Sequence, residues 1–123
     1  MRVPSFRVEV GIDLVQVSRI AESIALFGDR FLKKIFTDAE LAYASSSPSQ
    51  TCERLAARFA AKEATKKALR LEGVGFRSIE VQRAPSGACD LVLHGHASPG
   101  ALSVSLSHEG DYATAIVACL RPT

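Results

Sequence analysis

The segment from Cys52 to Leu71 constrains the fold most strongly, because it is the longest stretch that favours a single kind of structure. It is rich in Ala, Leu, Arg, Lys and Glu, all of which are good helix formers. Gly73 and Gly75 follow it and are expected to end the helix. A chain of 123 residues fits one domain, residues 1–123, with one modest core. This helix is therefore the principal helical element of that domain.

Strand signals flank the long helix. Apolar and polar residues alternate from Phe6 to Leu14, and this period of two predicts a strand with one buried face. Four β-like segments separated by turn residues follow the helix: 78–83, 90–94, 102–107 and 112–120. Helices gather in the first half of the chain and strands in the second. This order predicts an α+β domain rather than a parallel βαβ repeat.

The first half carries two further helix signals. Apolar residues recur at helical spacing from Ile20 to Phe27, and Gly28 is a plausible stop. Thr37 and Glu40 have the spacing of a capping box, in which each side chain bonds the other residue's backbone N–H. A short helix is expected to follow Thr37.

Composition excludes several function classes. Apolar residues make up 47% of the chain and charged residues 23%, which is an ordinary globular balance. The net charge of +2 is too small to indicate nucleic acid, and six Phe, two Tyr and no Trp give no basic stripe interleaved with aromatics. No segment resembles a signal peptide or a membrane span. The three scattered cysteines fit a reducing cytosol, so a cytoplasmic protein is expected.

Glu63 is the first candidate for a chemical role. On a helical wheel at about 100° per residue, Ala56, Phe59 and Ala60 lie within about 60° of it, so the carboxylate falls inside the apolar stripe. A carboxylate beside the core needs a cation or strong hydrogen bonds. The alternative is a surface ion pair with Lys67, one turn later. The basic residues of this helix are interpreted as a solvated face: Lys62, Lys66, Lys67 and Arg70.

Asp13 and His108 are the other candidates. Asp13 lies near the end of the first strand, and it is expected either to join Glu63 in holding Mg²⁺ or to cap the following helix. Mg²⁺ prefers a few carboxylates and leaves positions open for water and substrate phosphates. His108 ends an alternating strand, where it can bind an anion, act in acid–base chemistry or simply face solvent.

Three segments carry the most specific motifs of the chain. The first is Val10-Gly11-Ile12-Asp13-Leu14-Val15 with Ser18-Arg19-Ile20. The second runs from Glu53 to Ala64 and includes Arg58-Phe59-Ala60-Ala61-Lys62-Glu63, with Lys67-Ala68 after it. The third is Val104-Ser105-Leu106-Ser107-His108, leading into Tyr112-Ala113. Their order and spacing cover nearly the whole chain. Together they resemble the holo-acyl-carrier-protein synthases, which are short phosphopantetheinyl transferases.

The resemblance implies a fold, a reaction and a set of roles. The fold is an antiparallel sheet packed on a long helix, and the reaction transfers 4′-phosphopantetheine from coenzyme A to a serine of an acyl carrier protein. Magnesium ligands fall on Asp13 and Glu63, with Glu63 also the candidate base. The other roles are charge stabilisation by Lys67, coenzyme contacts by Lys67, His108, Gly73 and Gly75, and carrier docking by Arg19 and Arg30.

Two features depart from that family's pattern. The family often has Gly-Thr-Gly directly after its lysine helix, whereas here Gly73-Val74-Gly75 comes a few residues late. A Gly-x-Pro turn before the third strand is also replaced, by Ser86-Gly87-Ala88-Cys89. The displaced glycines keep open the alternative of a non-catalytic module that binds coenzyme A or a carrier protein. Both changes also leave open whether the carrier serves fatty-acid or polyketide synthesis.

A homotrimer with active sites at subunit boundaries is expected, chiefly from the resemblance. The last β segment supports this, because apolar residues occupy both of its faces: Ala113, Ala115, Val117 and Cys119 on one, and Ile116, Ala118 and Leu120 on the other. A strand that is apolar on both faces needs cover on both sides. A buried central strand is the alternative explanation.

Overall fold

The computed structural model describes residues 3–123 and contains helices and antiparallel strands, as the sequence predicts. The strands are β1 (Phe6–Gln16), β2 (Ile79–Arg83), β3 (Cys89–Leu93), β4 (Ala101–Glu109) and β5 (Tyr112–Pro122). The helices are α1 (Val17–Phe27), α2 (Asp29–Ile35), α3 (Asp38–Ser45) and α4 (Thr51–Leu69), with single 3₁₀ turns η1 (Pro48–Gln50) and η2 (Phe76–Ser78). Across residues 3–123, no helix has the length and hydrophobicity needed to cross a bilayer.

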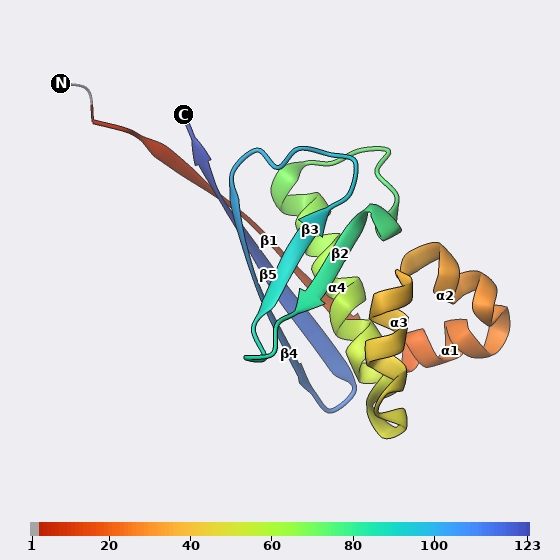
Figure 1. Ribbon diagram of the computed structural model, residues 1–123. Helices are drawn as coiled ribbons and strands as arrows, with labels where there is room; N and C mark the ends of the chain where they lie inside the picture. The colour runs from red at the N-terminus through yellow and green to blue at the C-terminus, as the bar shows by residue number, and fades with distance from the viewer. Residues whose placement is uncertain (1–2) are drawn as a thin grey trace.

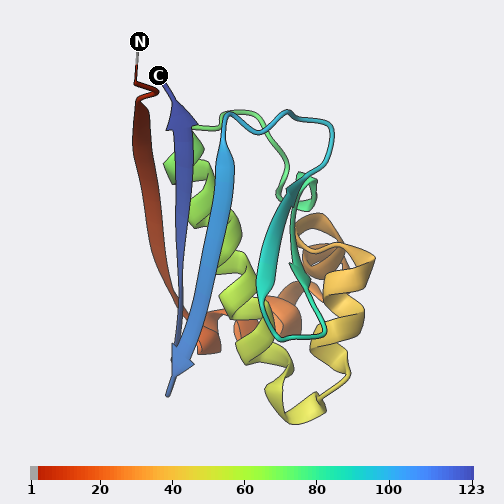
Figure 2. The same cartoon turned by 60° about the vertical axis from the view of Figure 1, so that its left-hand side comes forward.

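The strands form two separate sheets. β5 is the centre of a three-stranded antiparallel sheet in the order β1-β5-β4, with Asp13 opposite Ala115 and Leu106 opposite the same alanine (Figure 1). The four strands predicted after the long helix are all present, but β2 and β3 pair only with each other. Figure 2 shows this hairpin on the far side of α4 from β1.

Helix α4 is the centre of the molecule and contacts β1, β5, β4, β2, α1 and α3. Its alanines are buried against one face of the three-stranded sheet, where every second residue of β5 from Ala113 to Cys119 is also buried. Gly11 permits the closest approach, because a Cβ added there would lie 2.0 Å from the carbonyl oxygen of Ala64. Small residues on both elements therefore bring α4 directly onto the β1 backbone.

The helix ends agree with the sequence in one place and differ in another. The capping box of α3 is formed, with Glu40 N–H donating to Thr37 Oγ1 and Thr37 N–H to Glu40 Oε1. Asp13 does not cap α1. That carboxylate comes from Asp111 in the β4–β5 turn, which accepts from Ser18 N–H at 2.9 Å and from the Ser18 hydroxyl at 2.7 Å. The last turn of the sheet thus fixes the first turn of α1.

The interpretation of Lys62 as part of a solvated face is wrong. Lys62 and Glu40 are both fully buried, and Lys62 Nζ lies 2.7 Å from Glu40 Oε1. The ammonium also donates to the backbone carbonyls of Phe76 and Ile79, while Glu40 Oε2 accepts from Val81 N–H. Burial lowers the pKa of Lys62, and the Glu40 charge opposes that shift. Ion pair and hydrogen bonds together join α3, α4, η2 and β2.

Loss of this buried cation is expected to be severely destabilising. Lys62→Met leaves the Glu40 carboxylate buried without its counter-ion, so urea unfolding should show about 3–5 kcal/mol lower stability. Lys33→Met, on the exposed face of α2, is the matched control and should have little effect. Adding Glu40→Gln to Lys62→Met should restore part of the loss, because no charge then remains buried. Wild-type stability in Lys62→Met would refute this account.

Candidate active site

Asp13, Glu63 and Lys67 come together where α4 crosses β1. Lys67 Nζ lies 3.1 Å from Asp13 Oδ1 and donates to the Ile12 carbonyl at 3.1 Å. The Asp13 side chain is 19% exposed and that of Lys67 is 56% exposed, so the pair lies at the edge of the core. The surface pairing of Glu63 with Lys67 is not what the structure shows, because Lys67 turns to Asp13.

The two carboxylates face a shared pocket of about 400 Å³. Asp13 enters it from β1 and Glu63 from α4, and Arg19 of α1 also lines it. Phe31 and Phe59 complete an apolar wall. Glu63 is half-buried and lines the same pocket as Phe59, so the residue lies at the border of the core, as its place in the apolar stripe predicts. Strand β1 and helix α4 thus deliver two acids to one opening, and α1 adds a cation.

This donor set fits Mg²⁺ better than a self-sufficient metal cage. Among residues 3–123, no group of three or more His, Cys, Asp or Glu side chains is placed to hold a metal ion. Two carboxylates that share an open pocket match a cation that keeps most positions for water and phosphate oxygens. Asp13 and Glu63 would be the protein ligands.

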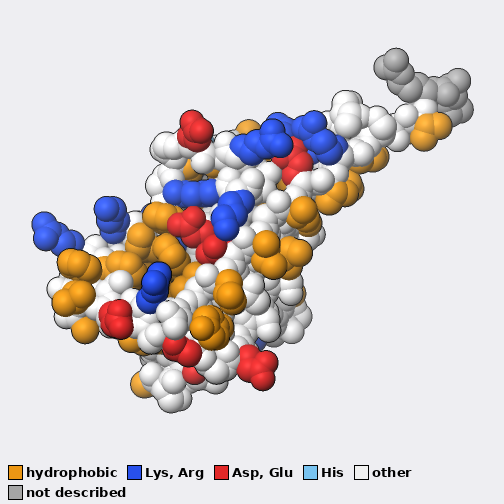
Figure 3. All heavy atoms as spheres, turned by 180° about the vertical axis from the view of Figure 1, so that it is seen from behind, with side chains coloured by type: hydrophobic (Ala, Val, Ile, Leu, Met, Phe, Trp, Pro, Cys, Tyr) orange, Lys and Arg blue, Asp and Glu red, His pale blue; other side chains and the backbone are white. Residues whose placement is uncertain are grey.

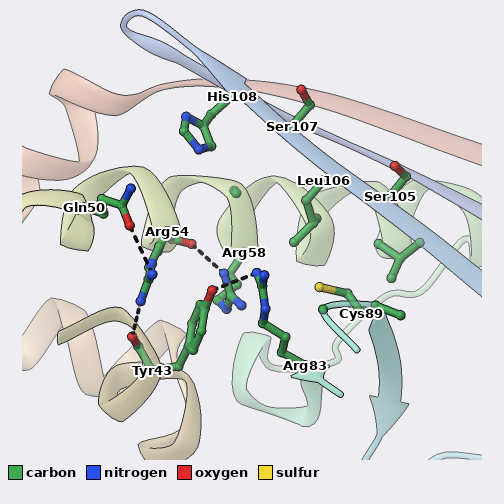
Figure 4. Close-up of a pocket in the computed structure, with 14 residues that line it drawn as sticks. Tyr43, Gln50, Arg54, Arg58, Arg83, Cys89, Ser105, Leu106, Ser107 and His108 are labelled. Atoms are coloured by element: carbon green, nitrogen blue, oxygen red, sulfur yellow. Dashed lines mark hydrogen bonds between the residues drawn. The ribbon is translucent and has the colours of Figure 1, made fainter. Parts of the chain in front are cut away.

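A second pocket, of about 550 Å³, lies beside the β4 edge and contains three arginines (Figure 4). They surround the Tyr43 ring, with the guanidinium carbons of Arg54 and Arg58 at 4.3 and 4.2 Å from its centroid. Arg83 donates to the Tyr43 hydroxyl at 2.8 Å. Nothing in the local sequence pattern marked these residues, since they come from α3, α4 and β2 and meet only after folding.

Arg58 is the residue of this pocket that most clearly indicates anion binding. It is 3% exposed, and burial lowers the pKa of its guanidinium. Within residues 3–123, its Nε is the one buried side-chain nitrogen or oxygen without a hydrogen-bond partner. A buried cation with an unused donor beside a hollow is suited to bind an anion. His108 lines the same pocket, and its Nδ1 lies 3.6 Å from Glu53 Oε2.

The two pockets lie on opposite sides of α4. At about 100° per residue, Arg54 and Arg58 project about 140–180° around the helix from Glu63. Asp13 belongs to β1 and His108 to β4, which are separated by β5 and hence by about 10 Å. A single chain therefore does not bring His108 together with Asp13 and Glu63.

The remaining predicted residues occupy the periphery. Gly73 and Gly75 lie in the loop after α4, and neither lines the pocket of Asp13 and Glu63. Arg19 is exposed on α1, and Arg30 is exposed on α2, a helix that the sequence did not predict. The structure thus groups Arg19, but not the glycines, with the carboxylate pair.

Gly11 holds the carboxylate pair in register, and its replacement is expected to disturb both stability and geometry. Gly11→Ala forces a methyl group into the α4 backbone, so we expect thermal unfolding to show a loss of about 2–3 kcal/mol. Gly75→Ala is the control, because nothing lies within 4 Å of its added Cβ. Equal stability in the two variants would show that the close approach is not required.

A family model and the sequences of known proteins both relate this chain to the same family. The model of the 4′-phosphopantetheinyl transferase superfamily matches residues 9–117. A holo-[acyl-carrier-protein] synthase of Koribacter versatilis is 46% identical over 117 residues, covering 87% of this chain and 93% of that protein. One from Carboxydothermus hydrogenoformans is 45% identical over 120 residues, covering 90% and 96%.

Solved structures agree with this match. The Chronobacterium ammoniagenes ACPS–coenzyme A complex superimposes with a TM-score of 0.84 at 33% identity, covering 95% of this chain and 98% of that one. The Bacillus anthracis holo-(acyl-carrier-protein) synthase, solved with CoA (3′,5′-ADP), gives a TM-score of 0.82 at 30% identity over 95% and 99%. On this evidence, together with the paired carboxylates and the shared fold, the chain belongs to the 4′-phosphopantetheinyl transferase superfamily.

Proposed function

We propose that the chain is a holo-acyl-carrier-protein synthase, which transfers 4′-phosphopantetheine from coenzyme A to a serine of an apo acyl carrier protein. The observation that carries this is the opening that Asp13 and Glu63 share, together with the pairing of Lys67 to Asp13. Residues 1–123 would form one transferase domain. The free cysteines Cys52, Cys89 and Cys119 are compatible with a cytoplasmic enzyme.

The chain's own residues account for each part of the transfer. Asp13 and Glu63 would hold Mg²⁺, which when bound neutralises phosphate charge. Glu63, directly or through a water, accepts the serine proton. The serine oxygen then bonds to the phosphorus that carries pantetheine, and the diphosphate bridge breaks. Adenosine 3′,5′-bisphosphate leaves with the electron pair, and Lys67 stabilises the charge that develops.

The arginine pocket is suited to the other end of coenzyme A. Its three guanidinium groups face a hollow without a carboxylate among the residues that line it. Adenosine 3′-phosphate offers both an aromatic base and an anion, which match stacking and charge-assisted bonds from arginine. His108 at the rim would contact the phosphates, as the family resemblance implies.

The carrier protein would dock on the helical end of the molecule. Arg19 on α1 and Arg30, Lys33 and Lys34 on α2 are exposed there, and acyl carrier proteins are acidic. Leu26 and Phe27 are 75% and 58% exposed on the same segment. Arg19 also lines the carboxylate pocket, so docking at this end would direct the carrier serine to Glu63.

Assembly as a homotrimer would complete the site. The sheet face opposite α4 carries an exposed apolar row, including Val8 and Ile12 at 63% each and Leu14 at 65%, which follows the N-terminal strand in Figure 3. Exposed apolar surface of this kind marks an interface. Because β1 and β4 are the two edges of this sheet, a cyclic contact through this face would bring the β1 edge of one copy toward the β4 edge of the next. Each boundary would then unite one carboxylate pocket with a neighbour's arginine pocket.

The first test addresses the carboxylate pair. Asp13→Asn and Glu63→Gln remove the proposed metal ligands with little change in volume, so carrier modification followed by mass spectrometry should fall by about 10³-fold. Asp38→Asn, an exposed acid on α3, is the control. Full transfer by either site variant would refute the assignment. A wild-type chain that binds coenzyme A but modifies no carrier would instead indicate a non-catalytic binding module.

The second test addresses the shared site. Glu63→Gln and His108→Ala are each expected to be impaired, but trimers refolded from an equal mixture should recover activity at about a quarter of their boundaries. Recovery follows because an intact Glu63 from one copy can then meet an intact His108 from the next. Each variant refolded alone is the control. A mixture no more active than the mean of the two controls would show that one chain supplies both residues.

A further inference from the structure

The end of α4 adopts a backbone conformation that its sequence does not favour. Arg70 caps the helix with φ 53° and ψ 46°, in the left-handed region. It is the sole residue other than glycine with positive φ within residues 3–123. Glycine usually occupies this position, because a side chain there is strained. The strain indicates that the arginine side chain has a use that glycine would not serve.

Arg70 lines a hollow of about 240 Å³ between β1 and the last turn of α4. Arg7 and Lys67 line it too, and Glu9 is the only acid among its lining residues. Glu9 is already engaged by Arg121 at 2.9 Å and Arg7 at 3.0 Å, and these partners lower its pKa. Arg70 has no ion-pair partner among the described residues. The hollow therefore carries surplus positive charge.

Lys67 joins this hollow to the candidate active site. Its Nζ contacts Asp13, and the same side chain lines the hollow beside Arg70. Arg70 lies just past the end of the helix, and because its side chain lines the same hollow as that of Lys67, the two cations face one space. A ligand with two linked phosphates could place one beside Asp13 and Glu63 and the other toward Arg70.

We propose that Arg70 is a substrate-binding residue that contacts the diphosphate of coenzyme A together with Lys67. This rests on the proposed function, since it assigns a further contact for the same substrate. The planar guanidinium can donate two parallel hydrogen bonds to one phosphate, which the point charge of a lysine cannot. The alternative is that Arg70 serves only to offset the helix dipole. That role would not require a left-handed backbone.

Titration calorimetry without a carrier protein tests the proposal. Coenzyme A and 3′-dephospho-coenzyme A are bound to the wild type, Arg70→Gly, Arg70→Lys and the control Arg77→Ala. Arg70→Gly should weaken binding of both ligands by about tenfold or more, and equally, because both retain the diphosphate. Its melting temperature should rise, because glycine relieves the left-handed strain. Arg70→Lys should recover only part of the affinity, and Arg77→Ala should match the wild type.

Specific outcomes overturn the proposal. Unchanged affinity for coenzyme A in Arg70→Gly would remove Arg70 from the binding site. A loss seen with coenzyme A but not with its 3′-dephospho form would assign Arg70 to the 3′-phosphate and overturn the diphosphate contact. Transfer assays on the same preparations separate the two proposals: a wild type that transfers nothing overturns the proposed function, whereas unchanged affinity in Arg70→Gly overturns this one.

Discussion

The buried pairing of Lys62 with Glu40 fixes how α4 lies in the molecule. A fully buried ammonium is tolerated only with its charge and donors satisfied, and Glu40 with two backbone carbonyls does this. The pair anchors one side of α4 to α3 and β2, while Gly11 lets the other side meet β1. Because Glu63 follows Lys62 directly, the same restraint sets the direction of the Glu63 carboxylate.

Two chemically distinct pockets follow from that orientation. The side of α4 toward β1 presents acids, and the opposite side presents arginines around Tyr43. Keeping them apart prevents the carboxylates from neutralising the guanidinium groups, so each can serve a substrate. Arg58 shows this most clearly, with a buried Nε that has no partner in the described chain.

The separation of the two pockets also suggests a role for the exposed sheet face opposite α4. An isolated chain exposes a row of aliphatic side chains on β1, whereas Ser103, Ser105 and Ser107 occupy the same face of β4. A sheet face with an exposed aliphatic row is suited to packing against a neighbour's sheet rather than to contact with solvent. Under the proposed assembly, one interface both covers apolar surface and joins the two halves of the site.

The sequence by itself determined the element types wherever a local pattern was sufficient. Alternation predicted β1, composition predicted α4, and Thr37 with Glu40 predicted the start of α3, because each of these depends on neighbours in the chain. A family motif also singled out Asp13, Glu63 and Lys67 as candidate site residues, and their proposed roles stay predictions. Only the tertiary structure showed that Lys62 is buried, that Asp111 caps α1, and that the arginines surround Tyr43. These depend on contacts between residues distant in sequence, whose energies no local pattern records.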